Sequence, residues 1–454
     1  MKIITEQEFN TYWKNRSLTN EENQTTEIVR NIIADVRKRG DAALWEYTKK
    51  FETETPKQFE IPFSEAEKAY TKLKAEKPEL ICALEYAAHN IYTFATEQKK
   101  QFSNFEIEIA PGLFTGQKVI PLESAALYIP GGKYPLMSTV LMTVIPALVA
   151  GVEKIVLLTP PPVNNAILAA LYVCYNNLYK NKEPVSKLNS SPSGGGWVGA
   201  SLHIYTLGGA QAVAAVAFGT ETIPRCDIIA GPGNAYVAEA KRQLYGTIGI
   251  DLIAGPTDVL LLCDATANIC TVAADLLAQA EHDPNAAARC LLPNSTMAET
   301  LQQEIEKQLD KMPTKETAQK SLDNNGLIIL YDDIENALAI ANTIAPEHME
   351  LQIENAEQYI DKLHNYGSLF IGENAAEVLG DYSAGINHTL PTLGTAHYTG
   401  GLSVRNFLKT PTTLSVTEAN KEALEAARLI AEAEGLAGHA QAAKIRHNFF
   451  RSPT

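Results

Sequence analysis

The chain has 454 residues, of which 45% are hydrophobic and 20% charged, and its formal net charge is −15 at pH 7. A single hydrophobic core usually stops growing at about 250–300 residues, so we expect at least two core domains. The acidic balance, with scattered lysines and arginines, argues against nucleic acid and against an anionic membrane surface as partners.

The ends and the cysteines indicate the compartment. The amino-terminal segment MKIITEQEFNTYWKNR lacks the apolar region of a secretory signal, and no run of about 18 apolar residues occurs in the chain. The 6 cysteines form no CxxC pair, and most of them lie in apolar runs such as VLLLCD. We therefore expect a protein of the reducing cytoplasm that has no membrane-spanning helix and no cysteine nucleophile.

The first hundred residues are expected to be mostly helical. Ile28, Ile32 and Val36 recur at helical spacing, and Gly40 followed by Asp41 indicates the end of one helix and the start of the next. We interpret this region as a packed helical lead-in rather than as a nucleotide-binding unit.

From about residue 124 the pattern changes to short apolar runs that alternate with helical segments. We expect strands at 124–130, 154–160, 202–207 and 226–232. Three of these strands end in glycines and run into helices, which is typical of a parallel α/β sheet whose helix N-termini a ligand can approach. There is no strict GxGxxG motif, so the glycine turns alone only suggest a dinucleotide site.

A second alternation begins near residue 258 and predicts another α/β unit of similar size. Its expected strands lie at 258–264, 289–293, 326–331 and 368–372. The tail from about residue 416 is expected to be helical, with a polar face that would suit docking. Residues 180–199 are rich in Pro, Ser, Gly and Lys, and we interpret them as an insertion in a surface connection.

The segment AQAEHDP at 278–284 is expected to end a helix that begins near Ala267. Gln279 and His282 are three residues apart and would share one helix face. An amide oxygen and an imidazole on one face could bind a metal ion. The alternative is a polar helix end that faces solvent.

Two later segments pair an acid with an imidazole. APEHMEL at 345–351 places Glu347 beside His348, and two such groups can act as separate proton carriers. The alternative for this segment is a helix start, where Pro and Glu are favoured. In GDYSAGINHTLPT at 380–392, Asp381 and His388 flank a Ser-Ala-Gly turn, which is either a site loop or an ordinary surface loop.

The carboxyl-terminal tail contains Glu434 and His439, five residues apart. In a regular helix their directions would differ by roughly 140°, so they could not bind one ion together. Either the helix breaks near Gly435 or Gly438, or only one of them is a ligand, or both face solvent.

Together and in this order, these segments resemble the signature blocks of the histidinol dehydrogenase family. Each block is weak alone, but the set is jointly specific and runs from the helical lead-in to the tail. The blocks are LYIPGG (127–132), PLMSTVLM (135–142), LGGAQA (207–212), GPGNAYVAEAK (231–241), AGPTD (254–258), AQAEHDP (278–284), APEHMEL (345–351), GDYSAGINHTLPT (380–392), GLSVRNFLK (401–409) and AEGLAGH (433–439).

The resemblance implies an α/β fold with two Rossmann-like parallel-sheet domains, a helical N-terminal lead-in and a small helical C-terminal tail that docks on the partner subunit. The implied first domain, 26–105 with 256–402, carries the zinc and catalytic residues. The implied second domain, 106–255, contacts NAD and contains the 180–199 insertion. Residues 1–25 and 403–454 would form small, mainly helical dimerisation regions.

The resemblance also implies roles for individual residues. One zinc ion per subunit would be bound by Gln279, His282, Asp381 and His439. His348 would be the general base, and Glu347 would activate water. The implied substrate contacts are Thr257, Gln279, His282, His348, Asp381, His388, Glu434 and His439. The implied NAD contacts are Tyr128, Gln211 and Asn234.

The implied reaction oxidises L-histidinol to L-histidine in two NAD-dependent steps through a bound aldehyde, the last steps of histidine biosynthesis. In the implied homodimer the terminal helix crosses to the partner, so that Glu434 and His439 would serve the neighbour's site.

The chain departs from the family pattern in three places. Thr257 stands where Ser is usual, Asp258 stands where Glu is usual, and the connection at 180–199 is longer. Two alternatives remain: a sister dehydrogenase of the same fold acting on another primary alcohol, such as a sulfonated diol, or a zinc- or nucleotide-binding protein without redox activity. His388 and Glu434 argue against the first alternative, and Glu347 with His348 argues against the second.

Overall fold

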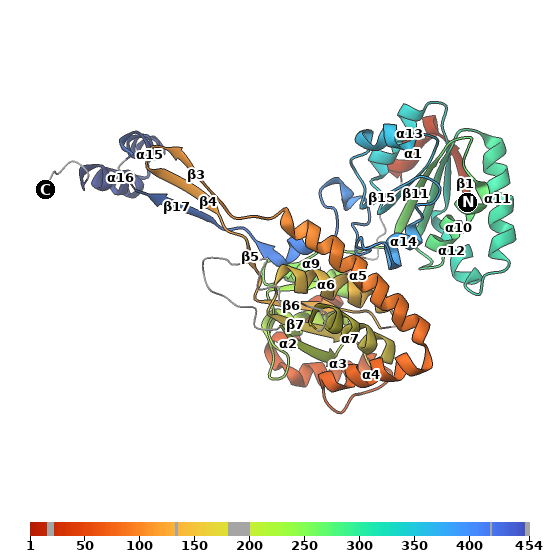
Figure 1. The fold of residues 1–454 in the computed structure, drawn as a ribbon, viewed down its shortest axis with the longest axis horizontal. Helices are drawn as coiled ribbons and strands as arrows, with labels where there is room; N and C mark the ends of the chain where they lie inside the picture. Colours follow the sequence, from red (N-terminus) through yellow and green to blue (C-terminus); the bar gives the residue numbers. More distant parts are fainter. Residues whose placement is uncertain (16–21, 132–134, 180–199, 418–419, 450–454) are drawn as a thin grey trace. The chain divides into compact units, whose positions relative to one another are not determined.

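The computed structural model describes residues 1–15, 22–131, 135–179, 200–417 and 420–449. The chain forms two compact units. Unit 1 comprises Met1–Lys99 and Leu122–Phe407, and unit 2 comprises Lys100–Pro121 and Leu408–Thr454. Unit 1 contains two six-stranded sheets, here called sheet 1 and sheet 2, as the fold class predicted from the sequence requires (Figure 1).

Sheet 1 is parallel throughout. Its strand order is β1 (Lys2–Thr5), β13 (Leu327–Leu330), β12 (Ala287–Leu292), β11 (Asp258–Cys263), β14 (His348–Gln352) and β15 (Ser368–Ile371). Successive side chains of β11 point to opposite faces: Leu260 packs in one buried cluster and Leu261 in the other. Helices therefore cover both faces, as a buried parallel sheet requires.

The helices of sheet 1 divide between its two faces. One face is covered by α1 (Glu6–Asn15) and α13 (Ile334–Ile344), and the other by α10 (Ile269–Ala280), α11 (Ser295–Leu309) and α12 (Lys315–Asn325) (Figure 1). The segments after β14 form α14 (Glu377–Tyr382) and the 3₁₀ helices η2 (Ala356–Lys362), η3 (Thr395–His397) and η4 (Val404–Phe407).

Sheet 2 contains the four strands that the sequence predicts between residues 124 and 232. Its order is β10 (Gly249–Ile250), β9 (Ile228–Ala230), β6 (Ser124–Tyr128), β7 (Lys154–Thr159), β8 (Ser201–Thr206) and β2 (Glu60–Ile61). Only the edge strand β2 is antiparallel to its neighbour. The helices around it are α2 (Glu22–Arg39), α3 (Asp41–Phe51), α4 (Phe63–Glu76), α5 (Pro78–Lys100), α6 (Met137–Ala150), α7 (Asn165–Tyr179), α8 (Gly209–Phe218) and α9 (Ala235–Leu244).

The packing of the amino-terminal segments differs from the domain boundaries expected from the sequence. β1 pairs with β13, and Phe9 of α1 is buried in the core of sheet 1, so residues 2–15 belong to sheet 1 rather than to a dimerisation region. Val29 and Val36 of α2 are buried with the residues of sheet 2, so α2 and α3 do not join the segment 256–402. Long-range pairing of apolar faces, rather than chain order, sets this grouping.

Unit 2 is built from two segments that are far apart in the sequence. Strands β17 (Thr412–Val416), β4 (Leu113–Gln117) and β3 (Phe105–Ala110) form an antiparallel sheet, and β16 (Leu408–Lys409) pairs with β5 (Ile120–Pro121). Helices α15 (Lys421–Ala433) and α16 (Ala437–Phe449) pack on each other. The expected helical tail is present. Residues 105–117 belong with it in unit 2 rather than with the expected NAD-contacting domain, because β3 and β4 pair with each other and β4 pairs with β17.

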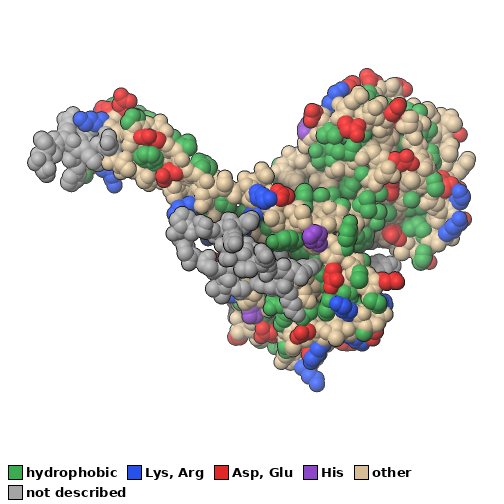
Figure 2. Space-filling view, viewed as in Figure 1, with side chains coloured by type: hydrophobic (Ala, Val, Ile, Leu, Met, Phe, Trp, Pro, Cys, Tyr) green, Lys and Arg blue, Asp and Glu red, His purple; other side chains and the backbone are tan. Residues whose placement is uncertain are grey.

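The surface agrees with the charge pattern of the sequence. On the face drawn in Figure 2, acidic and basic side chains are interspersed and form no large patch of one sign. No helix in the described part of the chain is both long and apolar enough to span a membrane.

Candidate active site

The predicted acid–imidazole pair lies at the amino end of a strand. His348 is the first residue of β14 and lies opposite Val259 of β11, so the alternative of a helix start for this segment is wrong. Both Glu347 and His348 are buried. The sequence did not predict β14, because Glu350 and Gln352 interrupt its apolar pattern although the strand is buried.

The Glu347 carboxylate is buried and held by its neighbours. Its Oε2 accepts hydrogen bonds from Thr257 Oγ1 at 2.5 Å and from the backbone N–H of Asp258 at 3.1 Å. Burial raises the pKa of Glu347 to about 7, against the opposing effects of His348 and the Thr257 hydroxyl. A carboxyl group that titrates near neutral pH can both accept and release a proton.

The His348 imidazole lies between two carboxylates. Its Nδ1 is 3.7 Å from Glu377 Oε1, and its Nε2 is 3.5 Å from Asp381 Oδ1. Burial alone would lower the pKa of His348, but the surrounding carboxylates together raise it well above its ordinary value. The surrounding carboxylates thus favour the protonated imidazole over the neutral form that can accept a proton.

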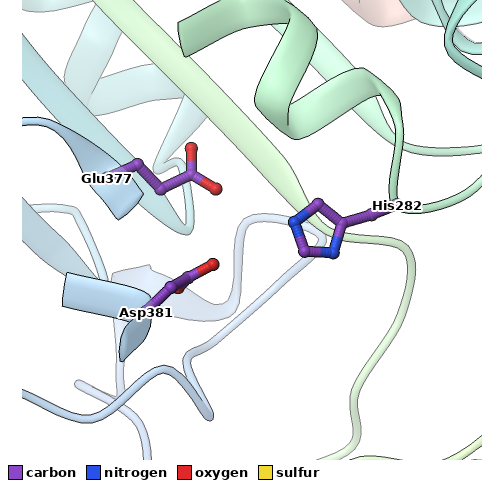
Figure 3. Close-up of side chains that lie close together, drawn as sticks. All are labelled: His282, Glu377 and Asp381. Carbon is purple, nitrogen blue, oxygen red and sulfur yellow. The ribbon is translucent and has the colours of Figure 1, made fainter. Parts of the chain in front are cut away.

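Three side chains converge to form a candidate metal site. One possible ligand atom from each of His282, Glu377 and Asp381 lies within 4.8 Å of the other two (Figure 3). Gln279 carries a further possible ligand atom, its side-chain oxygen. Its Nε2 donates a hydrogen bond to Thr257 Oγ1 at 2.8 Å, and its buried Oε1 has no hydrogen-bond partner. Nitrogen and oxygen donors of this kind suit a borderline divalent ion such as Zn²⁺.

Helix α10 ends earlier than the sequence predicts. Its last residue is Ala280 and Glu281 is the C-cap, so His282 lies beyond the helix and does not share a regular helix face with Gln279. The turn nevertheless brings the His282 imidazole toward the α14 carboxylates (Figure 3).

Glu377 is the member of this cluster that the sequence analysis missed. It begins α14, four residues before Asp381, so both carboxylates lie on one side of the helix. Two acids four residues apart, soon after the predicted strand 368–372, were the sequence signal that could have revealed Glu377. Glu377 is buried, and its Oε2 has no hydrogen-bond partner.

His388 connects this cluster with α6, the helix that follows β6 of sheet 2. Its Nδ1 is 3.1 Å from the backbone carbonyl of Asp381, and its Nε2 is 3.2 Å from Thr139 Oγ1 at the start of α6. Burial lowers the pKa of His388, which favours the neutral ring. In that form Nδ1 donates to the carbonyl and Nε2 accepts from the threonine.

The expected NAD contacts gather at the carboxyl ends of the strands of sheet 2. Tyr128 ends β6, Gln211 lies in the first turn of α8 after β8, and Asn234 caps α9 after β9. The Tyr128 hydroxyl accepts a hydrogen bond from the Gly209 N–H at 3.0 Å, and burial raises the pKa of Tyr128 to about 12. Asn234 Oδ1 accepts from two backbone amides of α9, while its side chain remains exposed.

Strand order in sheet 2 reverses between β6 and β9, which is where open α/β sheets usually bind ligands. Gly231 follows β9 at this point with φ 112°, and a Cβ there would lie 2.3 Å from the Tyr128 carbonyl oxygen. Lys241 and Asp251, both buried, bind the backbone carbonyl and N–H of Gly231 at 2.9 and 2.7 Å. These contacts hold the loop that ends in Asn234, and only glycine at position 231 allows its close approach to Tyr128.

Glu434 and His439 lie in unit 2. Helix α15 ends at Ala433, Gly435 has φ 76°, and α16 begins at Ala437, so the helix breaks near Gly435 as one of the sequence alternatives required. Both side chains are exposed. The predicted insertion 180–199 lies outside the described residues.

Comparison with known proteins identifies the family. A family model described as histidinol dehydrogenase matches residues 15–180 and 198–447, so the insertion falls between the two matched segments. Histidinol dehydrogenase of Aquifex aeolicus is 42% identical over 430 residues, covering 94% of this chain and 93% of the relative. That of Streptococcus mutans is 38% identical over 441 residues, covering 96% of each chain.

A solved structure agrees with the sequence comparisons. The crystal structure of histidinol dehydrogenase from Elizabethkingia anophelis matches with a TM-score of 0.86 and 36% identity, and the match covers 99% of this chain and 98% of that one. The chain therefore belongs to the histidinol dehydrogenase family, a family of oxidoreductases.

Proposed function

We propose that the protein oxidises L-histidinol to L-histidine through L-histidinaldehyde, with NAD as the hydride acceptor in both steps and one zinc ion in each site. The observation that carries this proposal is the buried cluster at the amino ends of β11 and β14. There, a carboxyl group with a pKa of about 7 and an imidazole lie next to unpartnered donors for a metal ion.

The residues present fit a zinc ion. Gln279 through Oε1, His282 and Asp381 would hold it, with His439 of the partner subunit as the fourth ligand. Bound there, zinc would act as a Lewis acid that binds the imidazole and amino nitrogens of the substrate and orients its carbinol carbon. A cation beside Asp381 and Glu377 would also offset the negative charge that raises the pKa of His348, and would so favour the neutral imidazole that a base requires.

The first oxidation needs a base beside the alcohol. Neutral His348 would accept the hydroxyl proton while a hydride leaves the carbinol carbon for the nicotinamide. This step forms the aldehyde, one NADH and one proton.

The second oxidation needs an activated water molecule. Glu347 would accept a proton from a water molecule while the water oxygen bonds to the aldehyde carbon. The resulting hydrate would then lose a second hydride to a second NAD. The Glu347 pKa near 7 suits a group that must take up this proton and pass it on. Holding the aldehyde in place would prevent loss of a reactive intermediate.

The remaining expected residues complete the two binding sites. Thr257, His388 and the partner's Glu434 would contact the substrate. Tyr128, Gln211 and Asn234 would contact NAD at the reversal of strand order in sheet 2. The Thr139–His388 contact would place the start of α6, which follows β6, beside the substrate.

A homodimer is supported by the exposed apolar side chains of unit 2. Alternate residues of β3 form an exposed apolar face, and β17 and α15 expose further apolar side chains. Together they expose more apolar surface than a monomeric protein normally leaves in contact with water. These side chains are Phe105, Ile107, Ile109, Leu414, Val416, Leu429 and Ile430. A partner subunit that covers them would bring its own Glu434 and His439 to the neighbour's site.

The test is the number of NADH molecules formed per L-histidinol consumed, measured by absorbance with and without a chelator. Two NADH per substrate, abolished by chelation and restored by zinc, is the expected result. No turnover of L-histidinol by zinc-loaded protein would overturn the proposal and favour the sister dehydrogenase, which a screen of other primary alcohols, including sulfonated diols, would then identify.

A further inference from the structure

Arg289 is the one charged residue of β12, a strand that is paired on both sides. Such strands are normally apolar, because a buried charge is unfavourable unless it is paired. The Arg289 side chain is 11% exposed, and its Nη1 lies 2.5 Å from Asp258 Oδ2. Its guanidinium also lies 5.4 Å from the centre of the Trp13 ring. Arg289 is therefore fixed between a carboxylate and an aromatic ring.

The Asp258 carboxylate contacts both Arg289 and Glu347. Its second oxygen, Oδ1, accepts the backbone N–H of Glu347 at 3.2 Å, and Glu347 Oε2 in turn accepts the backbone N–H of Asp258 at 3.1 Å. The two residues thus fix each other's backbone at the amino ends of neighbouring strands.

The turn that leads into Glu347 is strained. Ala345, the C-cap of α13, is buried and has φ 50°, a conformation that residues other than glycine rarely adopt. A strained turn persists only where surrounding contacts fix it. The Asp258 carboxylate supplies such a contact two residues later, at the Glu347 N–H.

We propose that Arg289 is a positioning residue, which acts through Asp258 to hold the Ala345–Glu347 turn and so to place the Glu347 carboxylate against Thr257. The inference rests on the role of Glu347 in the proposed function. The proposal gives Arg289 no part in the chemistry: it binds one oxygen of the Asp258 carboxylate while the other oxygen accepts the Glu347 N–H.

The two oxidation steps depend on this support to different extents. His348 lies within β14, where backbone pairing with both β11 and β15 fixes its position. Glu347 precedes the strand, and its N–H is bound by the Asp258 side chain. Loss of Arg289 should therefore slow the aldehyde step, which uses Glu347, more than the alcohol step, which uses His348.

The test compares Arg289→Met and Arg289→Lys with the wild-type protein. We measure NADH formed per L-histidinol in the presence of an aldehyde trap, together with the rates of the two steps and amide exchange of the peptide that contains Glu347. Arg289→Met should slow the aldehyde step by about 10–100-fold, against less than about fivefold for the alcohol step, as expected when a supporting contact of a reacting group is lost. Aldehyde should then be trapped, the yield should fall toward one NADH, and the Glu347 amide should exchange faster. Arg289→Lys should show a smaller change in the same direction.

A matched control separates positioning from general destabilisation. Asn294→Ala removes the side-chain cap of α11, the helix that follows β12, and should lower stability without changing the ratio of the two steps. If a folded Arg289→Met variant oxidises the aldehyde at the wild-type rate, or if Asn294→Ala changes the ratio equally, the inference is wrong. Wild-type protein that forms no NADH from L-histidinol would instead overturn the proposed function.

Discussion

The two sheets of unit 1 share a strand order, apart from the direction of one edge strand, but place their polar groups at opposite ends. In each sheet the strand order reverses once, between β11 and β14 in sheet 1 and between β6 and β9 in sheet 2. The residues expected to contact NAD follow the carboxyl ends of the sheet 2 strands, where α/β proteins usually bind ligands. The acid–base residues of sheet 1 lie at the amino ends of β11 and β14, where Glu347 and His348 are buried.

If the proposed roles hold, this difference means that the two ends of a parallel sheet suit different tasks. The carboxyl ends of sheet 2 offer backbone amides and short polar side chains, which can bind a cofactor without burying charge. The amino ends of sheet 1 bury several carboxylates and an imidazole, whose charges must be balanced by partners or by a metal ion. Substitutions in sheet 1 should therefore affect chemistry, and substitutions in sheet 2 should affect cofactor affinity.

The largest effect is expected at His348. We predict that His348→Asn retains zinc but slows alcohol oxidation by about 10²–10⁴-fold, the usual contribution of a general base. Pre-steady-state NADH formation and metal analysis measure the two quantities. The exposed His364 provides the control, and His364→Asn should leave both unchanged. A His348→Asn variant that oxidises the alcohol at the wild-type rate would remove His348 from this role.

Mixed dimers test whether sheet 1 completes its site with residues of a partner. His282→Asn and His439→Asn should each be inactive as pure dimers. When the two are mixed and allowed to exchange subunits, each heterodimer should contain one intact site, which gives about a quarter of the wild-type activity in a random mixture. If mixing restores no activity although mass analysis shows heterodimers, His439 does not act across the interface.

The cofactor side should respond at Asn234. Asn234→Ala should raise the NAD dissociation constant by about tenfold, roughly the loss of one hydrogen bond, with little change in the rate at saturating NAD. It also removes the cap of α9, which should lower the free energy of unfolding by about 1 kcal/mol.

The cap of α11 supplies the matched control for this variant. Asn294 Oδ1 accepts the Met297 N–H at 2.9 Å, so Asn294→Ala should lower stability similarly without changing NAD affinity. Calorimetric titration with NAD distinguishes the two variants. Equal NAD affinities for both would place the cofactor elsewhere.

The smallest effect concerns stability, at the buried Glu350 of β14. Burial, together with the nearby Asp275, raises the pKa of Glu350 to about 7. Because the folded state favours the protonated form, its contribution to stability is complete below the unfolded pKa of about 4.5 and is lost as pH rises through 7. Glu350→Gln removes this pH-dependent loss. Between pH 5 and pH 8, the free energy of unfolding of the variant should therefore fall by about 1–3 kcal/mol less than that of the wild-type protein.

Denaturant unfolding at the two pH values measures this change. Gln352, whose Oε1 has no hydrogen-bond partner, can turn its amide to accept from the new side chain. The exposed Glu299 on α11 provides the control, and Glu299→Gln should leave the pH dependence as it is in wild type. The same pH dependence in Glu350→Gln as in wild type would show that the carboxyl group is not proton-linked to folding.

The sequence predicts sheet 2 better than sheet 1 for a physical reason. The main strands of sheet 2 are short, largely apolar runs, three of which are followed by glycines, and these local signals sufficed. In sheet 1, β14 carries Glu350 and Gln352 inside a buried strand. Glu350 accepts hydrogen bonds from Gln352 and from the backbone N–H of Glu377, a residue distant in the sequence. The pairing of β1 with β13 and of β3 with β4 and β17 likewise depends on distant segments.

The candidate site was predicted mainly through family resemblance. Local patterns suggested the Glu347–His348 and Gln279–His282 pairs and the loop of Asp381, but each kept an ordinary structural alternative until the blocks were read together. The Arg289–Asp258 pair was missed, because its two residues lie on different strands and no local spacing reveals them. Glu377 was missed although its spacing from Asp381 is visible in the sequence, because its approach to His282 depends on a distant segment.

Anomalous diffraction at the zinc edge, from crystals grown with zinc and L-histidinol, tests most directly whether the amino ends of sheet 1 hold the reacting centre. We expect one strong peak per subunit, bounded by Gln279 Oε1, His282 and Asp381, with the carbinol carbon beside His348. Zinc and substrate bound elsewhere, with these donors unligated, would contradict the account.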